Sequence, residues 1–184
     1  MRIHGLSLVA IASLLLTACA IPVAPYSPSY DNVKKLPAPP PTSRIGDFQA
    51  ANASVGSISV RADHLESPYG KDLVHYLQTA LQSEFAKAGL IDDNSHREVT
   101  AVIEENDIDT GGISDAHGVI QARFIVKKDG ASAYDRQIRI DHHWESSVLA
   151  AIANTRAAAA YPKMAQLLLE KLYADEDFIE ALKN

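Results

Sequence analysis

The sequence predicts an α+β fold: a two-layer sandwich in which a mostly antiparallel four-stranded sheet has two main helices on one face. Three features predict it: several segments in which apolar and polar residues alternate, two segments with helical apolar spacing, and an Asp129-Gly130 pair typical of a two-residue hairpin. Their order along the chain is β-α-β-β-β-α, and 184 residues suit one domain of ordinary size.

The first strand and the first helix are expected between residues 55 and 89. Alternation over residues 55–61 places Ile58 and Val60 on the inner face of a strand. A helix follows after Ser67-Pro68-Tyr69-Gly70, and Gly89 is expected to end it because glycine adopts positive φ readily. The apolar positions of this helix recur every three or four residues: Leu73, Val74, Leu77, Ala80, Leu81, Phe85 and Ala88.

Three further strands are expected at residues 98–108, at residues 119–128 and in the return strand after Asp129-Gly130. The return strand is apolar on one side and polar on the other, which predicts a sheet covered on a single face. Its apolar side is Tyr134, Ile138, Ile140, His142 and Trp144, and its polar side is Gln137, Arg139, Asp141, His143 and Glu145.

The segment 146–160 is ambiguous, because its alanines favour a helix while Val148, Ala150 and Ile152 alternate like a strand. We expect a helix over residues 155–173 that is kinked or restarted near Pro162, since proline lacks the N–H that a helix interior needs. Asp175 is then expected to cap a last short helix.

The N-terminus contains an apolar run from Leu6 to Leu16, too short to span a bilayer but typical of a signal peptide. It leads into Leu16-Thr17-Ala18-Cys19, which contains the single cysteine of the chain and resembles the lipobox of bacterial lipoproteins. The resemblance implies a signal peptide over residues 1–18 and lipidation of Cys19 with diacylglycerol and an N-acyl chain. The alternative is an ordinary secretory signal in which Cys19 has no role. No other cofactor is expected.

The residues after Cys19 predict where the chain is held. Among lipoproteins, Asp after the cysteine commonly means retention in the inner membrane; Ala20 therefore implies the outer membrane, facing the periplasm. Residues 19–45 are interpreted as the lipidated cysteine followed by an extended proline-rich tether, and residues 46–184 as one periplasmic α+β domain. Seven of the nine prolines lie in the tether: Pro22, Pro25, Pro28, Pro37, Pro39, Pro40 and Pro41.

The formal net charge of −6 argues against a nucleic-acid partner, because phosphate neutralisation needs a basic face. Removal of Arg2 with the signal peptide makes the charge one unit more negative. The expected partners are the membrane, through the lipid anchor, and an envelope protein or a second copy of the chain.

Most of the mature chain resembles the YajG-like family of uncharacterised bacterial lipoproteins. The resemblance rests on the lipobox, the proline-rich segment, the helix ending Phe85-Ala86-Lys87-Ala88-Gly89-Leu90, the hairpin at Asp129-Gly130 and the closing stretch 167–178. It implies a fold and an envelope location, and no activity.

One group of residues has metal-ligand chemistry. Asp141, His143 and Glu145 share one face of a strand and could bind a metal with a fourth ligand from His117 or His75. The same face carries other polar residues, so a solvated surface is the preferred interpretation.

No catalytic motif is found in the sequence. Glu104 and Glu105 are adjacent, and simple alternation places them on opposite faces of a strand, where they could not act as a pair.

Three functions remain open, in this order. The first is a non-catalytic adaptor or accessory subunit of a cell-envelope assembly. The second is a ligand-binding lipoprotein that holds a lipid, a glycan or a peptidoglycan fragment. The third is an enzyme, such as a metal-dependent hydrolase around His143; we do not expect the chain to be an enzyme.

Overall fold

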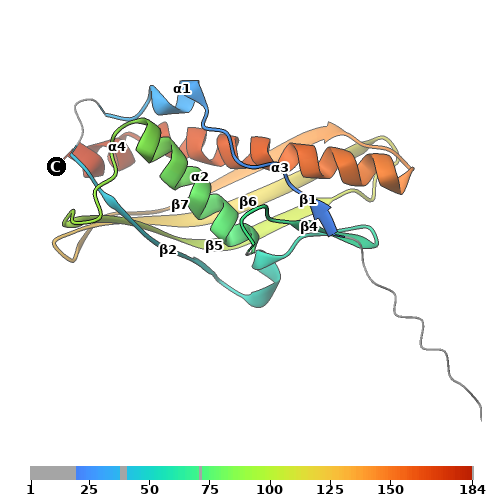
Figure 1. The fold of residues 1–184 in the computed structure, drawn as a ribbon, viewed down its shortest axis with the longest axis horizontal. Helices are drawn as coiled ribbons and strands as arrows, with labels where there is room; N and C mark the ends of the chain where they lie inside the picture. Colours follow the sequence, from blue (N-terminus) through green and yellow to red (C-terminus); the bar gives the residue numbers. More distant parts are fainter. Residues whose placement is uncertain (1–19, 38–40, 71, 184) are drawn as a thin grey trace, which may run out of the picture.

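The computed structural model describes residues 20–37, 41–70 and 72–183. It is an α+β sandwich in which a layer of helices lies on a long sheet (Figure 1), as the sequence predicts. The main sheet has the order β2-β5-β6-β7; β2 is parallel to β5 and the other neighbours are antiparallel. Its strands are β2 (Arg44–Ala50), β5 (Arg97–Asp109), β6 (Asp115–Lys128) and β7 (Ala131–Glu145).

The hairpin between β6 and β7 forms where the sequence predicts it. Asp129 and Gly130 both have positive φ, 49° and 82°, which matches the twist of the flanking strands. The register pairs Ile120 with Ile140 and Ala122 with Ile138, so the apolar side of both strands faces the helices.

Two long helices cover this apolar side, α2 (Leu73–Lys87) and α3 (Ala150–Tyr173). The N-cap of α2 is Asp72, whose side chain accepts a hydrogen bond from the N–H of His75, and Gly89 has φ 74° just beyond its end. Gly118 of β6 lies directly under α3, because a Cβ at that position would be 2.5 Å from the Cε of Met164. The short helix at the C-terminus, α4 (Glu176–Lys183), is preceded by Asp175, whose side chain accepts a hydrogen bond from the N–H of Asp177, as expected of a cap.

Of the kink or restart predicted near Pro162, the restart is wrong, and so is the expected helix start at residue 155. The helix α3 starts at Ala150, which settles the ambiguous segment as helix from that residue, and it continues through Pro162 to Tyr173. Buried residues lie on both sides of the proline, among them Ala157, Tyr161 and Met164. Packing of both halves on one sheet offsets the roughly 3 kcal/mol that an interior proline costs.

A second sheet, which the sequence did not predict, has the order β1-β4-β3. The segment 55–61 was expected to be the first strand of the main sheet; it instead supplies the end of a 3-10 helix, η1 (Ala53–Gly56), and the strand β3. Ile58 and Val60 are buried as expected, but alternation cannot tell which sheet a short strand joins. The strands are β1 (Ala20–Pro22), β3 (Ser59–Val60) and β4 (Asp63–Glu66).

The interpretation of residues 19–45 as an extended tether is wrong for the part that the structure describes. Residues 20–37 pack on the domain with Val23, Tyr26 and Leu36 buried, and include β1 and the short helix α1 (Tyr30–Val33). The expected domain start at residue 46 falls inside β2. The prolines are compatible with this packing because Pro22 ends an edge strand and Pro25 and Pro28 precede α1, where no ladder N–H is required.

A buried carboxylate holds this segment. Glu84 of α2 has no exposed surface, and its Oε1 accepts from the Tyr26 hydroxyl at 2.5 Å, the Ser29 N–H at 2.9 Å and the Asn32 amide at 3.3 Å. Burial and the bond to Glu84 raise the pKa of Tyr26, so its hydroxyl keeps the proton that it donates. Asn32 also donates to the backbone oxygen of Gln166, which links the segment to α3.

Replacement Glu84→Ala should therefore lower the free energy of unfolding by about 2–4 kcal/mol, because it leaves buried donors without an acceptor. Hydrogen exchange of residues 23–36 should rise in the same variant. The matched control is Glu170→Ala, which removes the exposed ion pair with Lys35 (3.2 Å) on the same segment and should cost under about 1 kcal/mol. If chemical unfolding shows similar losses of unfolding free energy for the two variants, Glu84 does not hold the segment as we describe.

Candidate functional site

The face of the main sheet that points away from the helices is polar along three strands. Positions that alternate with the buried ones in β6 and β7 carry amide and charged side chains, as the sequence predicts for the return strand. The helices lie on the opposite side of the sheet (Figure 1). We call this surface the open face; its residues in β6 and β7 include Gln121, Arg123, Lys127, Asp135, Gln137, Arg139, Asp141, His143 and Glu145.

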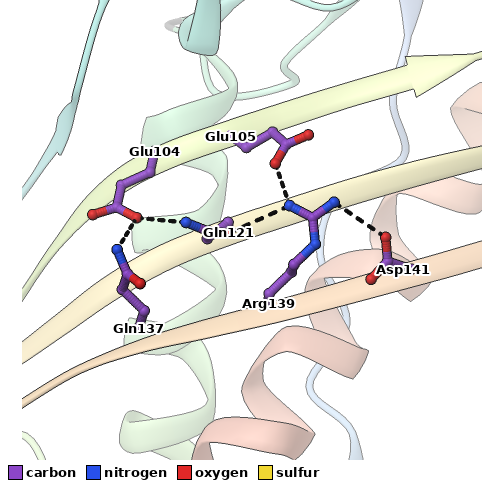
Figure 2. Close-up of polar contacts among 6 residues, drawn as sticks. All are labelled: Glu104, Glu105, Gln121, Gln137, Arg139 and Asp141. Atoms are coloured by element: carbon purple, nitrogen blue, oxygen red, sulfur yellow. Dashed lines mark hydrogen bonds and ion pairs between the residues drawn. The ribbon is translucent and has the colours of Figure 1, made fainter.

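A β-bulge in β5 adds two carboxylates to the open face. The register pairs Ile103 with Ala122 and Glu105 with Gln121, so Glu104 is an extra residue between them. Simple alternation predicted Glu104 and Glu105 on opposite faces, and that prediction is wrong. Figure 2 shows both carboxylates reaching the same group of side chains.

These carboxylates are held by a hydrogen-bond network of side chains from the three strands β5, β6 and β7. The Oε2 of Glu104 accepts from the Nε2 of Gln121 at 2.8 Å and from the Nε2 of Gln137 at 2.7 Å. Arg139 donates to Glu105, to the Oε1 of Gln121 at 3.3 Å and to the Oδ1 of Asp141 at 3.3 Å (Figure 2). The hydrogen bond to Glu105 raises the pKa of Arg139.

Next to this network, the guanidinium of Arg123 holds the carboxylate of Asp135 through bonds of 2.5 and 2.6 Å. That pair lowers the pKa of Asp135. The open face is thus a set of hydrogen-bond donors and acceptors fixed by cross-strand contacts and exposed to solvent. Such an arrangement is suited to recognising a polar partner surface.

The predicted metal ligands lie on the open face, where each contacts a different side chain. Asp141 is bonded to Arg139, Glu145 lies 4.0 Å from Arg156, and the ring of His143 stacks on His117 with centroids 5.6 Å apart. His75, the other proposed fourth ligand, is in α2 on the opposite side of the sheet, and its ring contacts Gln78. Within residues 20–37, 41–70 and 72–183, no group of three or more His, Cys, Asp or Glu residues is placed to hold a metal ion.

The space between the sheet and the helices is filled by core side chains, including Phe85, Phe124 and Tyr161. The described surface has several open depressions of about 330–400 Å³. One of them, of about 330 Å³, has a mainly apolar lining from β1 and α3: Ile21, Pro22, Ala24, Thr155, Ala158 and Ala159.

The proposed lipidation site, Cys19, lies outside the described residues. The described chain begins at Ala20, which already belongs to β1 and is paired with His64. None of the helices in the described part of the chain is both long and apolar enough to cross a membrane.

The fold and the open face define a small α+β domain with one face of its main sheet uncovered. No family model matches the chain, and no curated protein matches it. Among solved structures, protein XCC0632 from Xanthomonas campestris, described under the family name DUF330, has a TM-score of 0.58 at 15% identity, covering 89% of this chain and 97% of that one. This likeness shows a shared fold.

Two further structures are more distant. A minor lipoprotein from Acinetobacter baumannii has a TM-score of 0.42 at 9% identity, with 71% of this chain and 91% of that chain covered. Rare lipoprotein B from Shewanella oneidensis has a TM-score of 0.37 at 13% identity, with 71% and 96% covered. These neighbours are bacterial lipoproteins by name; none of the names is that of the YajG-like family, so that resemblance stays a prediction.

The structure also gives a testable pH dependence. His142 lies beside Trp144 on the covered side of β7, with ring centroids 5.6 Å apart, and burial together with the nearby Lys163 lowers its pKa below 6.5. Below about pH 6.5 the unfolded chain takes up a proton that the folded chain binds less well, so this residue lowers stability as the pH falls. Its contribution vanishes at higher pH, where both states are neutral.

Chemical unfolding between pH 7.5 and pH 5 should therefore show a smaller loss of stability for His142→Gln than for the wild type. His96→Gln is the control, because that ring is exposed and lies at the far end of the sheet. If the two variants lose stability equally on acidification, the partial burial of His142 is not the cause of the loss.

Proposed function

We propose that this chain is a membrane-anchored bacterial lipoprotein that acts as a non-catalytic adaptor or accessory subunit of a cell-envelope assembly. The observation that carries the adaptor role is the open face, a fixed and solvent-exposed array of polar groups on one side of the domain. The anchor is supported by the lipobox-like Leu16-Thr17-Ala18-Cys19 at the end of an apolar run.

The anchor has a clear energetic basis. A single acyl chain gives marginal and reversible membrane binding, whereas two or more chains give stable attachment. A diacylglycerol on the sulfur of Cys19 together with an N-acyl chain meets that requirement. Ala20 in place of Asp favours the outer membrane, with the domain in the periplasm.

The open face has the dimensions of a protein interface. Strands of 14 and 15 residues in β6 and β7 extend about 45 Å, and three strands side by side are about 15 Å wide. The product, several hundred Å², approaches the roughly 800 Å² that each partner buries in a standard complex. Because acidic and basic groups alternate across it, the face fits a partner by matched hydrogen bonds; that partner is an envelope protein or a second copy of the chain.

A second candidate is a ligand-binding lipoprotein for a lipid, a glycan or a peptidoglycan fragment. The observation that favours it is the mainly apolar depression of about 330 Å³ between β1 and α3, which falls at the lower end of the range of ligand pockets. Ala158→Trp would fill this depression. Retained function of such a variant in cells would exclude the depression as the functional site.

Replacement Cys19→Ser should move the protein from the membrane fraction to the soluble fraction of the cell envelope, because the acyl chains have no other attachment point. Metabolic labelling with palmitate and fractionation after a carbonate wash measure the two effects. If mass spectrometry finds a free thiol at Cys19 in the wild-type protein, the proposed anchor is wrong.

A photo-crosslinking residue at Gln137, in the middle of the open face, should give a discrete adduct with one envelope protein or with a second copy in intact cells. The matched control is the same residue at Gln82, an exposed glutamine in α2 on the helical side. A Gln137 variant that gives no adduct beyond the Gln82 background, while still membrane-bound, argues against the adaptor role of this face.

A further inference from the structure

The end of the domain where β5 stops and α3 starts has exposed apolar side chains. Ile113 is 78% exposed, Val148 and Leu149 are each 61% exposed, and Ile152 is 40% exposed. In the part of the chain that the structure describes, five large hydrophobic residues are exposed, and four of them are at this end; the fifth is Tyr30 in α1. We call these four residues the apolar end.

The local sequence gives no folding reason for this exposure. Residues 148–152, Val-Leu-Ala-Ala-Ile, are all exposed, although a run of exposed apolar residues is unfavourable in water unless something covers it. Leu149 occupies the N-cap of α3 and makes no side-chain capping bond, where Ser, Thr, Asp or Asn would satisfy a helix N–H.

The two loops that present the apolar end are held in place. The Nη2 of Arg61 donates to the backbone oxygen of Thr110 at 2.7 Å and to that of Ser147 at 2.9 Å. The N–H of Ser146 donates to the oxygen of Ser114 at 2.8 Å. The positions flanking Ile113 and Val148 are therefore fixed relative to each other.

The described chain also begins at this end. Ala20 is paired with His64 in β4, and the neighbouring Asp63 accepts a hydrogen bond of 2.6 Å from the Nδ2 of Asn154 in the second turn of α3. Figure 1 shows β1, the turn before β4 and the start of α3 at the same end of the molecule. Because consecutive Cα atoms are about 3.8 Å apart, an acylated Cys19 ties this end to the lipid surface.

Charge argues for zwitterionic lipid as the surface that the apolar end meets. Around the apolar end the exposed acids Asp109, Asp115 and Glu145 outnumber the exposed Arg61 and Arg156, so the net charge opposes contact with anionic headgroups. Insertion is then driven by the burial of apolar side chains.

We infer that the apolar end is a membrane-docking surface, which inserts Ile113, Val148, Leu149 and Ile152 into the interface of the bilayer that holds Cys19. The inference rests on the anchor of the proposed function and adds an orientation to it. The strands of the main sheet extend from this end toward the other end of the domain. The open face is therefore roughly perpendicular to the membrane plane and stays accessible to a partner that approaches along the membrane.

The test uses the full chain, purified with its native modification at Cys19 and reconstituted in phosphatidylethanolamine–phosphatidylcholine vesicles. An environment-sensitive fluorophore at Leu149→Cys should lose most of its emission when the lipids carry a spin-label quencher near the headgroup. The same fluorophore at Tyr30→Cys, the exposed hydrophobic residue away from this end, should be quenched by aqueous iodide instead. Ile113→Ser with Ile152→Ser should reduce the lipid quenching at position 149.

Vesicle flotation and mass spectrometry of Cys19 separate the two proposals. If the chain floats with acylated Cys19 while iodide quenches position 149 as strongly as position 30, the anchor stands and the docking inference is overturned. If neither the lipid quencher nor iodide quenches the fluorophore at position 149, a protein surface covers that position, and the docking inference is also overturned. A bare Cys19 without flotation overturns the anchor and the docking together. More quenching as phosphatidylglycerol is added would contradict the charge argument.

Discussion

The carboxylate of Glu84 determines where this domain begins. Because it is buried and accepts three hydrogen bonds from residues 26–32, the segment after Ala20 has fixed partners in α2 and, through Asn32, in α3. A buried carboxylate is stable only with such donors, and the buried hydroxyl of Tyr26 in turn needs the carboxylate as its acceptor, so helix and segment stabilise each other. The result is a domain whose first strand starts one residue after the proposed anchor, with no spacer between them.

The open face depends on a different local feature, the extra residue in β5. Without the bulge at Glu104, the strand would present one carboxylate to Gln121 and turn the next one toward the helices. With it, both carboxylates meet Gln121, Gln137 and Arg139 on one side (Figure 2). The sheet therefore keeps an apolar inner side while its outer side gains a network that spans three strands. In this way the 13-residue strand β5 contributes both to the core and to the open face.

Much of the fold follows from patterns that extend over many residues. The helix 73–87, the hairpin at Asp129-Gly130 and the two-sided character of β7 were all predictable, because each repeats one period or one turn signal several times. The misplaced elements were short or proline-rich. Nothing local distinguishes a two-residue strand such as β3, and composition alone describes residues 20–37 as a linker, since their partner Glu84 lies more than 50 residues away. A bulge likewise has no reliable sequence signal, so the arrangement of Glu104 and Glu105 required the structure.

A long linker and a docked domain have opposite effects on how a lipoprotein meets its partner. A spacer lets a lipoprotein search a large volume, and its effective concentration at any one partner falls as the spacer lengthens. In the arrangement that we propose, the domain begins at the anchor and contacts the lipid through Ile113, Val148, Leu149 and Ile152. It then searches a smaller volume, and it loses most of its rotational freedom before it meets a partner. The domain then loses its orientational entropy when it docks on the membrane, and not when it binds its partner. Because binding costs less entropy, a polar open face of modest size can bind a membrane-bound partner that a freely tumbling domain would bind only weakly.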